Sequence, residues 1–289
     1  MKKSVFILSF ILLLTSCDNE NLILEKSIFN ETNFDVSVEN NTLVFPKLED
    51  YENAIEYLSE MDEVELLTWG EMLGFNSLLY NVDYCDNKYV QDELLGALLN
   101  ENYEIIIGEN KFILDLENEI VNVISNSKLK FKKEKSHKTY STESNVIDII
   151  FYGVEEDESG IIAVEKLKKS KKGPYYWQTS GGKLKYKVVY QTAGIYFSLQ
   201  AKIKHTTKIG CNGWVDYGLE LEGDNNYYKP RNKSKKKISH YYSYGNCSSY
   251  NYRPYSSTRR LTEYNYNVYF FYNDNNTGDY KSTVVGLKR

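Results

Sequence analysis

Residues 183–190 read Lys-Leu-Lys-Tyr-Lys-Val-Val-Tyr, and this stretch decides the fold class of the second half of the chain. Successive side chains of a β-strand point to opposite faces, so alternating apolar and polar residues predict a strand. The pattern resumes after Ala193-Gly194 and continues to Ile203. We therefore expect two adjacent strands with one buried face each, formed by Leu184, Tyr186, Val188, Tyr190, Ile195, Phe197, Leu199, Ala201 and Ile203. The opposite face would carry Lys183, Lys185, Lys187, Tyr196, Ser198, Gln200, Lys202 and Lys204.

Further apolar runs follow at regular intervals, separated by clusters of turn-forming residues. They lie at 215–221, 238–244, 264–272 and 280–287. Regularly spaced strands without a helical period are typical of an antiparallel sandwich or barrel. We predict that residues 146–289 form an antiparallel β-sandwich.

A helical period dominates the first half of the chain instead. Apolar residues spaced by three or four from Tyr51 to Met61 predict a helix with one buried stripe. Asp62 and Glu65 have the spacing of a capping box, which predicts the start of a second helix. Two leucine pairs within residues 91–100 predict a third helix.

Short apolar runs flank the predicted helices. One lies at 43–45, and three more lie at 103–107, 111–116 and 120–124, which predicts a small meander. Helices combined with such strands make an α+β domain, expected at residues 41–127. The whole chain is therefore assigned to the α+β class, with a helix-plus-meander domain before the sandwich.

Polar segments frame the two predicted domains. Residues 18–40 are rich in Asn and Glu and predict a tether, and the charged, serine-rich residues 128–145 predict a linker. Apolar runs at 146–154 and 161–164 are compatible with a hairpin, or with a strand and a short helix. The stretch at 166–173 is basic.

The first seventeen residues have the organisation of an export signal. Lys2 and Lys3 precede an apolar run from Val5 to Leu14, which is too short to span a membrane. The ending Leu14-Thr15-Ser16-Cys17 resembles the lipobox of bacterial lipoproteins. The resemblance implies that residues 1–17 are a lipoprotein signal, that Cys17 carries the acyl chains, and that the protein is attached to a membrane of the cell envelope, at the outer membrane or cell surface.

Two other interpretations of this segment remain open, an ordinary cleaved secretory signal and an uncleaved anchor. Beyond the signal, the chain resembles uncharacterised lipoproteins in which a small helix-plus-sheet domain precedes a β-sandwich. That resemblance brings no catalytic motif with it.

Charge divides the chain into an acidic and a basic part. Residues 18–128 contain 25 acidic and 5 basic side chains, whereas residues 129–289 contain 15 acidic and 28 basic ones. Of the 27 tyrosines, 19 lie between Tyr175 and Tyr280, so the basic part is also the aromatic part. Such opposite charges predict that the acidic domain docks against the basic domain, or against that of a neighbouring molecule.

Three cysteines remain besides Cys17. In an oxidising compartment Cys211 and Cys247 could form a disulfide and leave Cys85 unpaired. The alternative is three free thiols. Their spacing fits no zinc motif, and we predict no metal ligand.

The sequence contains no recognisable catalytic constellation. The three histidines are His137, His205 and His240, and the metalloprotease, nucleophile-elbow and phosphate-loop motifs are all absent from the sequence. Residues 274–279 alternate oxygen-bearing side chains like a calcium loop, but a plain hairpin loop explains them equally. We therefore predict no catalytic residue and no cofactor.

The basic, tyrosine-rich part is the feature that most suggests a ligand. Flat tyrosine rings stack on sugars, and lysines attract anionic groups. This combination predicts non-catalytic binding of a glycan or another polyanion, with contacts from Trp214, Lys235, Lys236, Tyr241 and Tyr242.

The alternative to ligand binding is a purely structural role, in which the tyrosines fill half-buried strand positions because of their high β propensity. An assembly or accessory lipoprotein that contacts other envelope proteins is a second functional alternative, and a hydrolase is a third. A nucleic-acid partner is not expected.

Overall fold

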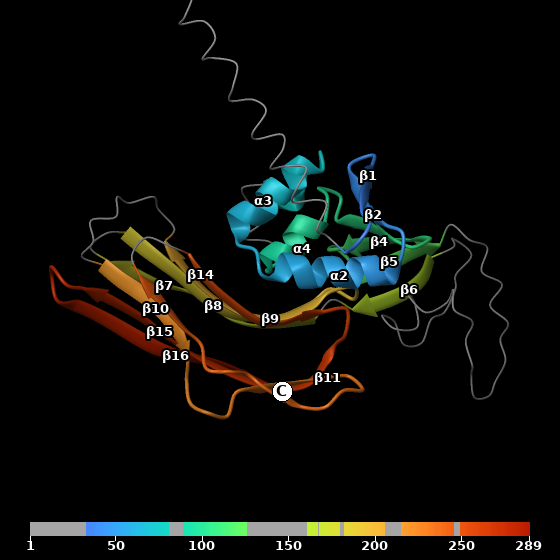
Figure 1. Cartoon of the computed structure of the whole chain (residues 1–289). Helices are drawn as coiled ribbons and strands as arrows, with labels where there is room; N and C mark the ends of the chain where they lie inside the picture. The colour runs from blue at the N-terminus through green and yellow to red at the C-terminus, as the bar shows by residue number, and fades with distance from the viewer. Residues whose placement is uncertain are drawn as a thin grey trace, which may run out of the picture.

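The computed structural model describes residues 33–80, 89–125, 161–166, 168–179, 182–205, 215–245 and 249–289. It confirms the predicted class, because a small region of helices and strands precedes two stacked antiparallel sheets. Figure 1 shows the helices above the sandwich and the first sheet beside them.

All three predicted helices are present, although the first begins three residues before Tyr51. They are α2 (Leu48–Ser59), α3 (Glu63–Met72) and α4 (Glu93–Leu98), with a short 3-10 turn, η1, at Leu78–Tyr80. The capping box is confirmed, since Asp62 accepts bonds from the backbone of Val64 and Glu65 while the Glu65 carboxylate accepts one from the Asp62 amide. The third helix is shorter than the predicted range 91–100, and every residue of α4 is buried.

The first sheet has six strands in sequence order. They are β1 (Ser37–Glu39), β2 (Thr42–Phe45), β3 (Glu104–Ile107), β4 (Asn110–Asp115), β5 (Ile120–Ser125) and β6 (Ile161–Lys166). β2 and β3 are parallel, and the other neighbours are antiparallel.

Two segment boundaries from the sequence need correction. β1 and the buried Phe34 lie within the range 18–40, so the end of the predicted tether belongs to the folded domain. β6 lies within the range 146–289 predicted as sandwich, but its hydrogen bonds go to β5.

The second sheet, sheet B, contains β7 (Lys168–Thr179), β8 (Gly182–Thr192), β9 (Phe197–His205) and β14 (Tyr250–Ser257) in the order β14-β9-β8-β7. The third, sheet C, is organised around the long strand β15 (Leu261–Asp274). Its partners are β16 (Asp279–Lys288), β10 (Val215–Leu221) and β11 (Tyr227–Pro230), with β12 (Lys236–Lys237) and β13 (Tyr242–Gly245) at the edges. Their facing apolar side chains form one core.

The predicted strand at 238–244 is wrong in its extent. Ile238 is a buried residue outside any strand, and the ladder there is divided between β12 and β13. The strands β7, β11 and β14 were not predicted, because Pro174, Pro230 and Pro254 and the many charged residues hide their period.

Strands β8 and β9 of sheet B are largely buried on both faces, which corrects the expectation of one buried face each. Ser198 and Gln200 are fully buried, and Lys202 is 4% exposed. The cause is the first domain, which lies on this polar face, as Figure 1 shows. The β8–β9 turn also joins the first domain's core through Ala193, Ile195 and Tyr196.

Several sequence predictions fall outside the described residues. They concern the signal and Cys17, most of the tether, the linker, the apolar run 146–154, and the residues Cys85, Cys211, Trp214 and Cys247. No helix in the described ranges is both long and apolar enough to cross a membrane.

Candidate functional site

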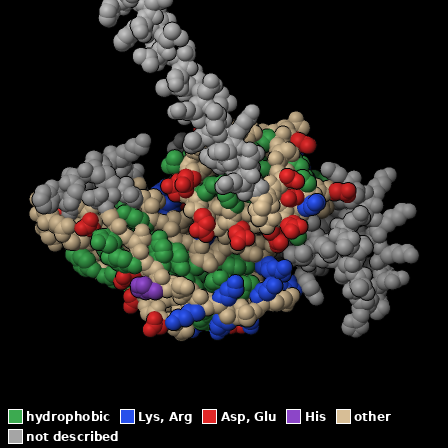
Figure 2. Space-filling view, viewed as in Figure 1, with side chains coloured by type: hydrophobic (Ala, Val, Ile, Leu, Met, Phe, Trp, Pro, Cys, Tyr) green, Lys and Arg blue, Asp and Glu red, His purple; other side chains and the backbone are tan. Residues whose placement is uncertain are grey.

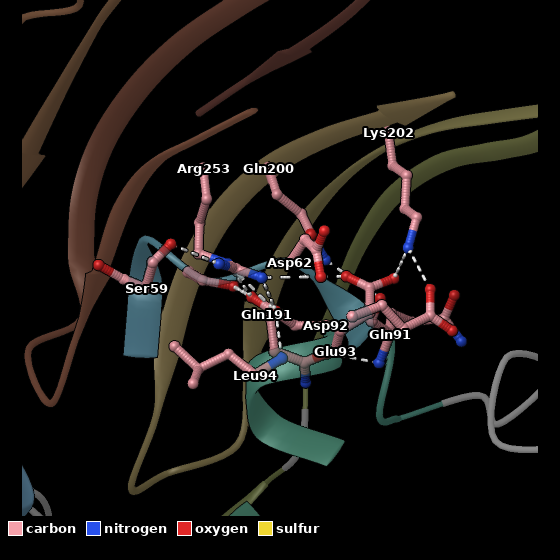
Figure 3. A network of polar contacts seen from close by, with 12 residues as sticks. Ser59, Asp62, Gln91, Asp92, Glu93, Leu94, Gln191, Gln200, Lys202 and Arg253 are labelled. Carbon is pink, nitrogen blue, oxygen red and sulfur yellow. Dashed lines mark hydrogen bonds and ion pairs between the residues drawn. The ribbon is translucent and has the colours of Figure 1, made fainter. Parts of the chain in front are cut away.

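The acidic domain docks on the basic sandwich through a buried polar network, drawn in Figure 3. Its centre is Asp92, the N-cap of α4, which accepts from the Leu94 amide at 3.0 Å. Arg253 of β14 donates to the Asp92 carboxylate through Nη2 at 2.8 Å and to Ser59 O through Nη1 at 2.9 Å. Tyr196 donates to the same carboxylate at 2.8 Å, and Ser198 also donates to it. Asp92 is thus coordinated by several donors from the sandwich.

A second ion cluster lies beside Asp92. The Lys202 ammonium is 2.8 Å from a carboxylate oxygen of Glu93 and 2.8 Å from one of Glu63. Burial alone would raise the pKa of Glu93, but Lys202, Lys187 and Arg253 together outweigh it and hold that pKa well below its ordinary value. Burial likewise opposes the charge of Lys202, yet the two glutamates raise its pKa.

Backbone groups complete this interface. The Gln91 amide donates to the Gln191 side chain at 2.9 Å, and Gln200 donates to the Gln91 carbonyl at 3.1 Å. Because Asp92 has no exposed surface and its oxygens are already occupied, the network is suited to holding two domains together and not to reaching a substrate. The acidic domain therefore docks against the basic domain of the same chain, which is one of the two arrangements that the charges predict.

An exposed group of aromatic rings lies on the other side of the sandwich, on the outer face of sheet C. We call it the aromatic platform, and its members are Tyr242, Tyr244, Tyr269, Phe271 and Tyr280. Three of them are among the most exposed large side chains, with Tyr242 48%, Tyr244 56% and Tyr280 57% exposed. Large aromatic side chains are normally more buried than these three, so an exposed cluster of them marks a candidate binding surface.

Strand register brings these rings together. Phe271 of β15 lies opposite Gly218 of β10, and Gly218 lies opposite Tyr244 of β13. Two residues farther along β10, on the same face, Glu220 lies opposite both Tyr269 of β15 and Tyr242 of β13. The ring centroids of Tyr242 and Phe271 are 6.1 Å apart with planes inclined by only 13°, so these two rings are nearly parallel.

Gly218 provides the space that this arrangement needs. A Cβ atom at Gly218 would lie 2.7 Å from Tyr244 Cβ and 2.2 Å from Ser243 O, which is closer than atoms pack. The glycine therefore lets β13 lie against β10 and lets Tyr244 lean toward Phe271, whose ring centroid is 6.4 Å away.

Among the described residues, the charged groups between the rings of the platform are acidic. Asp216 and Glu220 belong to the same outward face of β10 as Gly218. Desolvation raises the pKa of the Tyr242 hydroxyl, and Tyr244, Glu220 and Asp216 add to this rise. Carboxylates accept hydrogen bonds from hydroxyl groups and repel anions, so the platform is suited to a neutral, hydroxyl-rich ligand.

The predicted contact residues do not form one surface. Tyr242 belongs to the platform, but Tyr241 points into the sandwich and stacks on Tyr252, with ring centroids 3.9 Å apart. Lys235 lies over the Tyr227 ring at 3.8 Å and near Glu263, while Lys236 lines a pocket beside β11. Tyr244, Tyr269, Phe271 and Tyr280 were not predicted, although the alternation in 242–244 and 269–271 gives a signal for them.

The remaining polar candidates have structural roles. His205 packs edge-on against Tyr217, and burial lowers its pKa. Asp274 accepts from the amides of Asn276 and Thr277, so residues 274–279 form the turn of the β15–β16 hairpin. Among the described residues no group of three His, Cys, Asp or Glu side chains is placed to hold a metal ion.

Comparisons with known proteins identify one structural match. No protein-family model and no curated protein sequence matches the chain. The crystal structure of a DUF4848 family protein from Bacteroides thetaiotaomicron is similar at 11% identity, over 88% of this chain and 100% of that chain, with a TM-score of 0.22.

Proposed function

We propose that the protein is a non-catalytic glycan-binding protein of the cell envelope, attached through a lipid at Cys17. The observation that carries the binding proposal is the aromatic platform. Its rings present flat apolar faces to solvent from adjacent strands, and such faces stack on the C–H surfaces of sugar rings. A ligand would cover the exposed surface that Tyr242, Tyr244 and Tyr280 leave open.

The surroundings of the rings favour a neutral glycan over a polyanion. Asp216 and Glu220 would repel phosphate, sulfate or uronate groups, but they can accept hydrogen bonds from sugar hydroxyls. Apolar stacking surface combined with a few oriented polar groups is the usual composition of a small-ligand site.

The rigidity of the surface also supports recognition. Tyr269 and Tyr280 are joined by a hydrogen bond between their hydroxyl groups, and their strands β15 and β16 are paired over a long register. Tyrosine rings fixed on paired strands lose little conformational freedom when a ligand binds, which limits the entropic cost.

The anchor is the second half of the proposal. Cys17 and the residues around it provide the lipobox resemblance, and an acylated Cys17 would hold the binding domain at a membrane surface. An envelope glycan would then be within reach of the platform.

A glycan array tests the binding proposal. The full-length protein in detergent is used, because Tyr196 and its neighbours tie the sandwich to the first domain. We expect binding to neutral glycans that survives physiological salt and disappears in Tyr244→Ala. Tyr176→Ala, which removes a 44% exposed tyrosine from β7, is the matched control and should bind normally. Binding lost equally in both variants, or no binding at all, would contradict the proposal and favour the envelope-protein alternative.

A further inference from the structure

A pocket of about 440 Å³ lies at the opposite edge of sheet C from β13. It is formed where the end of α2 meets β11, the β11–β12 connection and β14. The volume is within the range of small-molecule sites, which is roughly 300 to 1,000 Å³. Both domains contribute to its wall, since Glu60 comes from the first and Tyr228 from the second.

Cations dominate the wall of this basic pocket. Lys233, Lys236 and Arg259 line it, and Glu60 is its single lining carboxylate. Within the described residues, none of these three cations forms an ion pair. Figure 2 shows Lys and Arg side chains gathered over this part of the sandwich, below the acidic side chains of the helical domain.

Neighbouring lysines are engaged in contacts of a different kind. Lys229 and Lys235 both approach the Glu263 carboxylate, at 2.8 Å and 3.8 Å. Lys236 lies on the other side of the same segment and lines the pocket instead. Three cations without an ion pair among the described residues therefore meet at the cavity.

Arg253 forms part of the same wall but is neutralised. Its guanidinium is held by Asp92 at 2.8 Å, so it shapes the pocket without adding free charge. Three cations against one carboxylate leave a surplus of two positive charges for a ligand to balance.

The frame of the pocket is fixed before any ligand arrives. Tyr255 donates to the Arg259 carbonyl, and Thr258 donates to Glu52 of α2 at 2.6 Å, which ties this loop to the first domain. The rings of Tyr228 and Tyr255 pack together with centroids 5.0 Å apart. A cavity whose frame is already tied together loses less entropy when a ligand binds.

We propose that the basic pocket binds a small ligand that carries a doubly charged phosphate group. Lys233, Lys236 and Arg259 would contact the oxygens, and the Tyr228 and Tyr255 rings would contact the rest of the ligand. This site is independent of the aromatic platform, because the two lie at different edges of sheet C and have opposite charge.

Isothermal titration of the full-length protein in detergent with pyrophosphate tests the proposal. We expect saturable binding at low salt that weakens as salt rises. Lys236→Gln should raise Kd about tenfold, which corresponds to the loss of one charge-assisted hydrogen bond. Lys237→Gln, which removes a charge from the same strand outside the pocket, is the matched control and should change Kd little.

Two further arms make the result unambiguous. Arg259→Gln should raise Kd as Lys236→Gln does. Lys236→Arg keeps the positive charge and should retain the wild-type affinity. Titration with glucose 6-phosphate and with glycerol 3-phosphate then distinguishes a sugar phosphate from a lipid headgroup, both of which contain the proposed group. The proposal is overturned if the wild-type protein binds none of these probes, or if Lys237→Gln weakens binding as much as Lys236→Gln.

Discussion

Arg253 and Asp92 form a buried ion pair across 161 residues of sequence, with 3% and 0% of their side chains exposed. The pair joins the edge strand of the sandwich to the N-cap of α4. It makes the two charge-segregated halves of the chain one structural unit.

The stability of the protein should depend strongly on this pair. Removing one partner leaves an uncompensated buried charge, so Asp92→Ala or Arg253→Ala should lower the free energy of unfolding by about 3–5 kcal/mol. Lys229→Ala removes a half-exposed ion pair with Glu263 and should cost no more than about 1 kcal/mol. Urea denaturation followed by circular dichroism measures all three, and similar small changes would contradict a central role for Arg253.

Acid should destabilise the protein through Glu93 and Glu63. The pKa values of both carboxyls are lowered in the folded state from the ordinary 4.5, because the nearby cations outweigh the effect of burial. Their stabilisation is therefore present above pH 4.5 and is lost as the pH falls from there toward the native pKa values. Each unit of lowered pKa is worth about 1.4 kcal/mol.

Unfolding free energies measured between pH 7 and pH 3 would reveal this dependence. Glu93→Gln cannot ionise at that position, so the variant should lose less stability over the same range. An identical slope in the variant and the wild-type protein would show that the acid sensitivity comes from other groups.

The β8–β9 turn should couple the unfolding of the two domains. Ile195 is fully buried in the core of the first domain although it belongs to the sandwich. Ile195→Ala should lower the free energy of unfolding by about 2–5 kcal/mol. Scanning calorimetry should show a single transition for the wild-type protein, whereas two well-separated transitions would contradict the interlocked arrangement.

Gly218→Ala should disrupt the platform without unfolding the sandwich. The new Cβ would clash with β13, and overpacking of this kind costs about 1–3 kcal/mol. Far-ultraviolet circular dichroism should retain the β signal, while glycan binding should fall as it does in Tyr244→Ala. Normal binding by the Gly218→Ala variant would mean that the position of β13 does not matter for the ligand.

Cys17→Ala should release the protein from the membrane fraction, because the acylated thiol is the proposed anchor. Cell fractionation followed by immunoblotting measures the distribution. Ser16→Ala keeps a small residue before the cysteine and should leave retention intact, so unchanged retention in Cys17→Ala would exclude the lipid anchor.

Local sequence signals predicted the elements that depend on local chemistry. The capping box of Asp62 and Glu65 and the alternation of Leu184, Tyr186 and Val188 both appear where the sequence places them. Helix starts and strand faces follow from neighbouring residues, so a single sequence contains the necessary information.

The interface and the sites were harder to predict because they depend on pairs distant in sequence. The alternation of Ser198, Gln200 and Lys202 suggested a solvated face, and nothing local indicates that Asp92 and Glu93 cover it. Tyr241 and Tyr242 were grouped as neighbours, although the period of a strand places adjacent residues on opposite faces. The basic pocket also needs α2, β11 and β14 together, which only the folded chain provides.

The most direct test of the proposed function is calorimetric titration of the full-length protein with neutral hexasaccharides of glucose, mannose, galactose and xylose. We predict that at least one of them binds in a salt-independent manner. Tyr242→Ala and Tyr244→Ala should each weaken its affinity about tenfold or more, while Tyr176→Ala should not. Absence of binding to every one of these sugars, or binding that none of the platform variants weakens, would contradict it.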